Sequence, residues 1–369
     1  MNEENKCSKK AVIKYAGAFI AWVVGSGFAT GQEALQFFSS YGYMSYGVLL
    51  INFIGFLFLG QVLLITGYEH KNVVSFNHFK YFCGEKIGAA YSGLIPFTLI
   101  LIMPVLLSGA GSTLNEYYGV NRYLGSAVMA VLVLATYLIG FERLVKIISA
   151  IGPAIIIFSL LVGTISIAND YGSFAEVPKY RYQLSKLQTA PHWTISAVLY
   201  LSLNFLSGSV YFTELGKSAD KRNDAKYGAL FGALAIILKI AIMNTAILLN
   251  AENISTLAIP VLYLARKISY ILGAVFSLVL ILGMFSSCSA MLWSICSRFT
   301  RGGKRGNRIF AVSITIIAFV LSLFSFGELI GVFYPIVGYV GLIFIGSVIY
   351  KGIKSNVINK LEAADKQVL

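Results

Sequence analysis

Charged residues are scarce in this sequence. They make up 12% of the 369 residues, about half of the roughly 25% that is usual for soluble domains. Apolar residues make up 57%, and the mean hydropathy is +0.76. This balance excludes an ordinary soluble globular chain and predicts a membrane protein with several spanning helices.

Motifs for catalysis and for nucleotide hydrolysis are also missing. No glycine-rich loop followed by Lys-Ser or Lys-Thr occurs, so ATP drive within this chain is not expected. The three histidines, His70, His78 and His192, lack the spacing of a zinc site. No serine and histidine share a depth in the predicted spans. We therefore predict that the protein is not an enzyme and has no catalytic residue.

Four cysteines do not form a disulfide framework, because two fall in predicted cytoplasmic segments and two lie inside one apolar run. The net charge of +13 raises the possibility of nucleic-acid binding. However, the basic residues lie in short connections between apolar runs. We expect the lipid bilayer and a small molecule as partners, no nucleic acid, and an oligomeric state that the sequence does not determine.

Ten apolar stretches approach the 20 or so residues that a helix needs to cross a bilayer. They cover residues 11–38, 43–68, 88–113, 122–140, 144–168, 191–216, 225–249, 268–298, 308–326 and 328–350. Most of the 29 Lys and Arg residues then fall on one side of the membrane. By the positive-inside rule, both termini of this predicted plasma-membrane protein are cytoplasmic.

Two connections have helical patterns of their own. Residues 70–84 carry apolar side chains among polar ones and predict a short amphipathic helix on the cytoplasmic side. Residues 255–267 predict a helical segment on the outer side. The predicted organisation is an N-terminal tail (1–10), a first half (11–168), an outer loop (169–190), a second half (191–350) and a C-terminal tail (351–369).

The first apolar stretch contains an unusual decapeptide, Val24-Gly25-Ser26-Gly27-Phe28-Ala29-Thr30-Gly31-Gln32-Glu33. It includes three glycines, two hydroxyl groups, an amide and a carboxylate. Glycine weakens a helix, and irregular backbone at membrane depth occurs only where it is buried in protein or lines a cavity. The decapeptide therefore predicts an interruption near residues 25–27.

The sixth apolar stretch contains a similar pattern at residues 204–214. In both stretches a Ser-Gly pair is followed, seven residues after the serine, by a glutamate. With five spans in each half, the second half is inverted relative to the first. Glycine-interrupted spans at corresponding positions of two inverted halves indicate a transporter's central site.

The stretch Gly25-Ser26-Gly27-Phe28-Ala29-Thr30-Gly31-Gln32-Glu33 resembles the opening helix of the YkvI-like amino-acid permeases. That family is part of the amino acid–polyamine–organocation superfamily. The resemblance implies an all-α membrane protein with the LeuT-type fold, in which ten helices form two inverted five-helix repeats and helices 1 and 6 are discontinuous. It implies secondary active transport of a small amino acid or amino-acid-like solute by alternating access.

Free backbone amides at the two interruptions would attract a substrate's carboxylate, and nearby side chains would add hydrogen bonds. The candidate substrate-binding residues are Gly25, Ser26, Gly27, Phe28, Thr30, Asn204, Ser207, Gly208, Ser209 and Tyr211. The alternative is that the small residues serve close helix packing.

The resemblance also implies a sodium site between the first and eighth helices. Its candidate ligands are the carbonyls of Ala21 and Val24 and the hydroxyls of Ser286, Ser287 and Ser289. Oxygen is the ligand that hard cations prefer. The alternative is that these hydroxyls bond to their own helix. A bound Na⁺ is the one cofactor that we consider.

Three charged residues lie deep in predicted spans, namely Glu33, Glu214 and Lys239. Intramembrane carboxylates line pathways, relay protons or form ion pairs. Coupling or gating and a structural pair with Lys239 are both open, as are Na⁺ and H⁺ as the coupling ion. Two other functions also remain open, an uncoupled facilitator or channel and a non-transporting membrane sensor.

Overall fold

The structure is a computed structural model, and it describes residues 8–23, 26–139, 151–299 and 303–368. The described residues form helices and no strands. The α-helices are α1 (Lys9–Val23), α2 (Ser26–Ala29), α3 (Gln32–Phe37), α4 (Ser45–Glu69), α5 (His78–Tyr118), α6 (Arg122–Ile139), α8 (Ile151–Asp170), α9 (Arg181–Ser185), α10 (Trp193–Lys217), α11 (Arg222–Leu249), α12 (Ala251–Ile254), α13 (Pro260–Ile268), α14 (Tyr270–Phe299), α15 (Gly303–Leu321) and α16 (Phe326–Val368). Two 3-10 helices cover Ser39–Met44 and Tyr171–Tyr180.

Every predicted span overlaps a helix, but the lengths differ. Among the described residues, seven helices are long and apolar enough to cross a membrane. The protein is therefore a multi-pass helical membrane protein, and the count of ten spans stays a prediction. The start of the fifth predicted span, at 144, lies outside the described residues.

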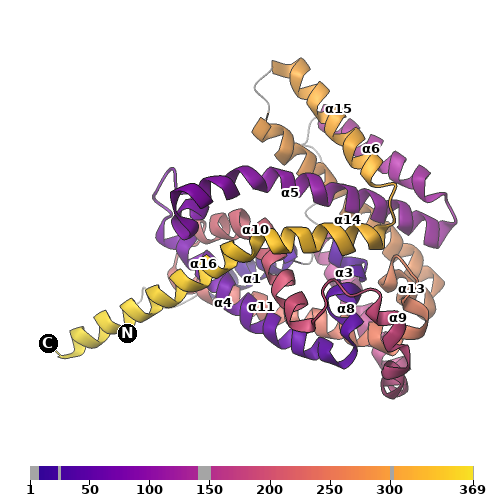
Figure 1. Ribbon diagram of the computed structural model, residues 1–369, viewed down its shortest axis with the longest axis horizontal. Helices are drawn as coiled ribbons and strands as arrows, with labels where there is room; N and C mark the ends of the chain where they lie inside the picture. Colours follow the sequence, from indigo (N-terminus) through magenta and orange to yellow (C-terminus); the bar gives the residue numbers. More distant parts are fainter. Residues whose placement is uncertain (1–7, 24–25, 140–150, 300–302, 369) are drawn as a thin grey trace.

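Two boundaries differ in detail from the prediction. A short helix in the predicted cytoplasmic segment begins at His78 and meets the helix of the third span at a kink at Gly84, and together they make up α5. Gly84 has a φ of +79°, a conformation that glycine adopts without the steric cost of a Cβ. α16 likewise continues well past residue 350 and extends away from the bundle at its C-terminal end (Figure 1).

Helices α4, α10, α11 and α16 pack together in the middle of the bundle, and α1 lies against α11. Glycines permit the close approach of α4 and α10. A Cβ on Gly67 would collide with the backbone carbonyl of Thr213, and one on Gly216 with that of Leu64. Small residues at crossing points are the usual means of helix packing in membranes. Apolar side chains such as Leu50 and Leu238 point outwards and are exposed, as expected of lipid-facing positions.

Candidate functional site

The first predicted span is divided into three helices. α1 ends at Val23, α2 is a single turn over Ser26–Ala29, and α3 begins at Gln32 after Gly31, which has a φ of +86°. Thr30 stabilises the turn, because its hydroxyl donates to the carbonyl of Gly27 (2.6 Å) and accepts from the amide of Gln32 (3.2 Å). Thr30 is therefore a structural residue of the interruption. Val24 and Gly25 lie outside the described residues.

A cavity of 630 Å³ lies beside this interruption. Its walls come from α1, α2, α3, α5, α10, α14 and α16. Polar groups in the wall include Glu33, Asn204, Ser207, Glu214 and Tyr334, and the apolar part includes Trp22, Pro96, Leu99 and Met291. Of the residues predicted to bind substrate, the cavity wall contains Gly27, Asn204, Ser207 and Tyr211.

The carboxylate of Glu33 reaches back across the interruption to Gly27. A Cβ on Gly27 would collide with a carboxylate oxygen of Glu33 and would lie 3.0 Å from the hydroxyl of Tyr334. The absence of a side chain at Gly27 therefore makes room for both polar groups in the cavity wall. Glu33 is 7% exposed, so its carboxylate faces this cavity from inside the protein.

The predicted break in the sixth span is absent, since α10 is a continuous helix from Trp193 to Lys217. Two of the polar side chains at the predicted break bond to their own helix. The amide of Asn204 donates to the carbonyl of Tyr200 (2.9 Å), and the hydroxyl of Ser207 donates to that of Leu203 (2.6 Å). These bonds satisfy the polar groups without freeing the backbone. The discontinuity predicted for this helix is therefore wrong.

Three other predicted residues do not line the cavity. Gly208 packs against the indole of Trp22, with Cδ1 lying 2.9 Å from the position of a Cβ. The hydroxyl of Ser209 donates to the carbonyl of Leu206 and lies 3.0 Å from Nε2 of His78. Phe28 is buried, and the ammonium of Lys239 lies over its ring. Gly208 therefore serves close helix packing, which was the alternative role considered for the small residues.

Trp22 and Tyr334 also belong to this site and were not predicted from the sequence. Trp22 stacks on Tyr211, with 5.1 Å between the ring centroids, and the hydroxyl of Tyr211 donates to the carbonyl of Ala18 (3.1 Å). Tyr334 comes from α16, near the opposite end of the chain. A tyrosine in an apolar span carries no local signal for this role.

The candidate sodium ligands lie partly at the cavity. Ala21 and Ser287 line it. Ala21 belongs to the last turn of α1, where carbonyls have no partner within the helix. The hydroxyl of Ser289 does not line the cavity; it is buried and has no hydrogen-bond partner among the described residues. A sodium site at these residues stays a prediction. Ser286 is half-buried and does not line the cavity.

The three deep charges are separated. Glu214 forms an ion pair with Lys217 (2.6 Å) and its side chain is 61% exposed. Lys239 is 1% exposed, and its ammonium lies 4.9 Å from the centre of the Phe28 ring. In the described part of the chain, Lys239 makes no ion pair or hydrogen bond with either glutamate, although it lies within electrostatic range of Glu33.

Two carboxyl groups, those of Glu33 and Glu214, are in the cavity wall, and no Lys, Arg or His side chain of the described residues is. Glu214 is already paired with Lys217, so the buried Glu33 is the acidic group left for a ligand. A carboxylate forms a charge-assisted hydrogen bond with an ammonium or guanidinium group. The arrangement therefore favours a ligand with a positive charge near Gly27.

The helix α13 covers the interruption on the side of Thr30. The amide of Val261 donates to the carbonyl of Thr30 (3.0 Å). The carboxylate of Glu116 accepts hydrogen bonds from the amides of Ala258 (2.6 Å) and Ile259 (3.2 Å). These contacts attach the segment before α13 to α5 and its first turn to the interruption.

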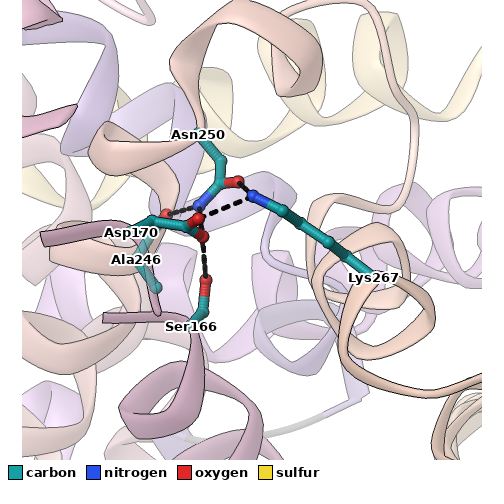
Figure 2. Close-up of polar contacts among 5 residues, drawn as sticks. All are labelled: Ser166, Asp170, Ala246, Asn250 and Lys267. Atoms are coloured by element: carbon teal, nitrogen blue, oxygen red, sulfur yellow. Dashed lines mark hydrogen bonds and ion pairs between the residues drawn. The ribbon is translucent and has the colours of Figure 1, made fainter. Parts of the chain in front are cut away.

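A polar cluster holds the other end of α13 (Figure 2). The ammonium of Lys267 donates to Oδ1 of Asp170 and to Oδ1 of Asn250, both at 2.8 Å. The amide of Asn250 donates in turn to Oδ2 of Asp170 (3.0 Å) and to the carbonyl of Ala246 (3.1 Å), and Ser166 completes the cluster. α13 is thereby fastened to α8 and α11.

No family model matches the chain. It is 27% identical over 351 residues to the uncharacterized membrane protein YkvI of Bacillus subtilis (strain 168), covering 93% of this chain and 97% of that protein. It is 22% identical over 334 residues to the uncharacterized protein YyaD of the same organism, covering 90% and 94%.

Solved structures show the same fold. MhsT in complex with L-phenylalanine has a TM-score of 0.58 at 16% identity, over 98% of this chain and 100% of that chain. A mutant of the manganese transporter of Eremococcus coleocola has a TM-score of 0.50 at 14% identity, over 87% and 72%. The predicted resemblance to YkvI is confirmed along nearly the whole chain, and the protein has the fold of these LeuT-type transporters.

Proposed function

We propose that this protein is a secondary transporter of a small solute that carries an amino group, most simply an amino acid. The observation that carries this proposal is the cavity beside the interruption of α1–α3, with the Glu33 carboxylate at Gly27 and no basic side chain in the described wall. An ammonium group placed there would form a charge-assisted hydrogen bond with Glu33.

The rest of the wall suits an amino acid. Asn204, Ser207 and Tyr334 are polar groups in the cavity wall, and Leu99 and Met291 provide an apolar surface for a side chain. The cavity is within the usual volume range of small-molecule sites. MhsT, whose fold this chain shares, is described in complex with L-phenylalanine, which supports an amino acid as the substrate class.

Two observations support alternating access. α13 is bonded to the interruption at Thr30 and to α5 through Glu116, and Glu214 in the cavity wall is exposed. We propose that this conformation is open towards the side predicted to be cytoplasmic. The coupling ion is Na⁺ or H⁺. For Na⁺, the carbonyl of Ala21 and the hydroxyls of Ser287 and Ser289 would be the ligands.

Uptake by the purified protein in liposomes tests this proposal. A labelled amino-acid mixture is supplied under a sodium gradient, a proton gradient or neither, and unlabelled competitors include an amine without a carboxylate and a carboxylic acid without an amine. We expect uptake under one gradient, with competition by the amine and not by the acid.

The matched variants are Glu33→Gln in the cavity and Glu176→Gln on the surface, where Glu176 pairs with Lys179 at 2.9 Å. The first should abolish most uptake and the second should leave it unchanged. Uptake without any gradient would identify an uncoupled facilitator instead. If no amine-bearing compound is bound or transported by folded protein, the assignment fails and a sensor becomes the better hypothesis.

A further inference from the structure

A second cavity, of 270 Å³, lies apart from the first, where four helices come together. α4 ends there, and α5 and α11 begin there. α16 contributes the residues that follow its apolar part, namely Lys351, Gly352 and Ser355. We call it the basic pocket. It is lined by the cations Arg222, Lys226 and Lys351 and by one carboxylate, that of Glu69.

The positive charges of the basic pocket are only partly compensated. Nε of Arg222 lies 3.2 Å from Oε1 of Glu69. The ammonium of Lys351 donates to the backbone carbonyl of Tyr81 and lies 4.3 Å from the centre of the Tyr81 ring. Lys226 has no ion pair or hydrogen bond within the described part of the chain. Three cations facing one carboxylate leave an excess of positive charge, which an anion would neutralise.

The walls of the basic pocket are amphipathic. Its apolar part is formed by Phe58, Val62 and Ile65 of α4 and by Phe82 of α5, and its polar part includes Gln61 and Thr66. Gly352 of α16 allows this close assembly, since a Cβ there would lie 2.7 Å from Val62 and 3.0 Å from Phe58. An anionic group on the cations and an apolar group on the α4 wall would both be accommodated.

The basic pocket also lies at the right depth for a lipid. It is at the ends of spanning helices, on the side that the distribution of Lys and Arg assigns to the cytoplasm. Basic pockets between spanning helices on this side of a membrane bind anionic head groups. Arg222, which opens α11, can present a planar guanidinium to a phosphate.

We propose that the basic pocket binds the phosphate of an anionic phospholipid, with Arg222 and Lys226 on the phosphodiester and the α4 wall against the glycerol and the first acyl carbons. The shared chemistry is a phosphate group, which free phosphate would also supply. The apolar wall favours the lipid. This site is independent of the transported solute and of the cavity at Gly27.

Native mass spectrometry and thermal unfolding of the full-length protein test the proposal. The protein is placed in phosphatidylcholine nanodiscs with increasing phosphatidylglycerol, and separately in detergent with inorganic phosphate. We expect phosphatidylglycerol to bind and to raise the melting temperature, and inorganic phosphate to have a much smaller effect. The preference should decrease with salt, as expected for partly exposed charges.

Variants assign the effect to the pocket. Removing one cation near a membrane surface weakens anionic-lipid binding about fivefold, so Arg222→Gln with Lys226→Gln should weaken it about 25-fold. Lys86→Gln is the control, because Lys86 is an exposed lysine of α5 that lines neither cavity. Glu69→Gln should instead strengthen binding by releasing Arg222, which keeps the test informative if the double variant does not fold.

Three outcomes would overturn the proposal. Equal lipid preference in the wild type and the folded double variant would remove the site. Stabilisation by inorganic phosphate equal to that by phosphatidylglycerol would make free phosphate the ligand. Weaker binding by Glu69→Gln would contradict the assigned role of the cations.

Discussion

Replacing Gly27 by alanine is a direct test of the carboxylate at the cavity. A Cβ on Gly27 would meet the carboxylate oxygen of Glu33 and would lie 3.0 Å from the hydroxyl of Tyr334 and 3.6 Å from Cδ of Glu33. Non-bonded carbon atoms are comfortable at about 3.5–4.0 Å. The flexible Glu33 side chain must therefore withdraw by about 1 Å or rotate away from the cavity wall.

The expected loss of substrate affinity follows from the hydrogen bond between Glu33 and the substrate's ammonium group, which Gly27→Ala would remove. A hydrogen bond involving a charged group contributes about 1.5–3 kcal/mol, and 1.4 kcal/mol corresponds to a tenfold change in affinity. We expect Gly27→Ala to weaken substrate binding about ten- to hundredfold. The fold should survive, because alanine is favoured over glycine in a helix by about 1 kcal/mol and Gly27 belongs to α2.

Equilibrium binding and initial uptake rates measure this effect, with circular dichroism and the melting temperature as checks of folding. Gly17→Ala is the matched control. It makes the same change in α1, and nothing lies within 4 Å of the added carbon. Unchanged affinity in a folded Gly27→Ala protein would show that the carboxylate does not contact the substrate at this place, and our reading of the cavity would be refuted.

Three further predictions concern the elements around the cavity. Gly31→Ala should lower the melting temperature by several degrees, because its φ of +86° costs a side chain about 1–2 kcal/mol and the Cβ would lie 2.6 Å from Val261; an unchanged melting temperature would show that the turn can rearrange. Lys267→Met should loosen α13 and increase severalfold the labelling of a Val261→Cys thiol by an impermeant maleimide, whereas equal labelling rates would mean that the polar cluster does not hold α13 in place. Glu33→Gln and Lys239→Met should be non-additive in thermal stability by about 1 kcal/mol or more if the two charges compensate each other, and strictly additive effects would exclude that pairing.

The interruption of the first span could be predicted from its own residues. Glycines and polar groups within ten positions destabilise the local helix, and Gly31 has the left-handed conformation that such a turn requires. The same local pattern misled us in the sixth span. There Gly208 keeps a helical conformation, the hydroxyl of Ser207 bonds to Leu203, and the helix stays intact. The backbone conformation of such a glycine depends on its packing and not on the local pattern.

What the sequence by itself determined is the class of protein, the overlap of each predicted span with a helix and the unusual first span, because these depend on hydropathy and on residues a few positions apart. Only the tertiary structure decided which side chains meet. Tyr334 of α16 lies beside Gly27 of α2, and the basic pocket combines Glu69, Arg222 and Lys351 from three helices. Helix packing brings these groups together over long sequence separations, and no local pattern encodes that proximity.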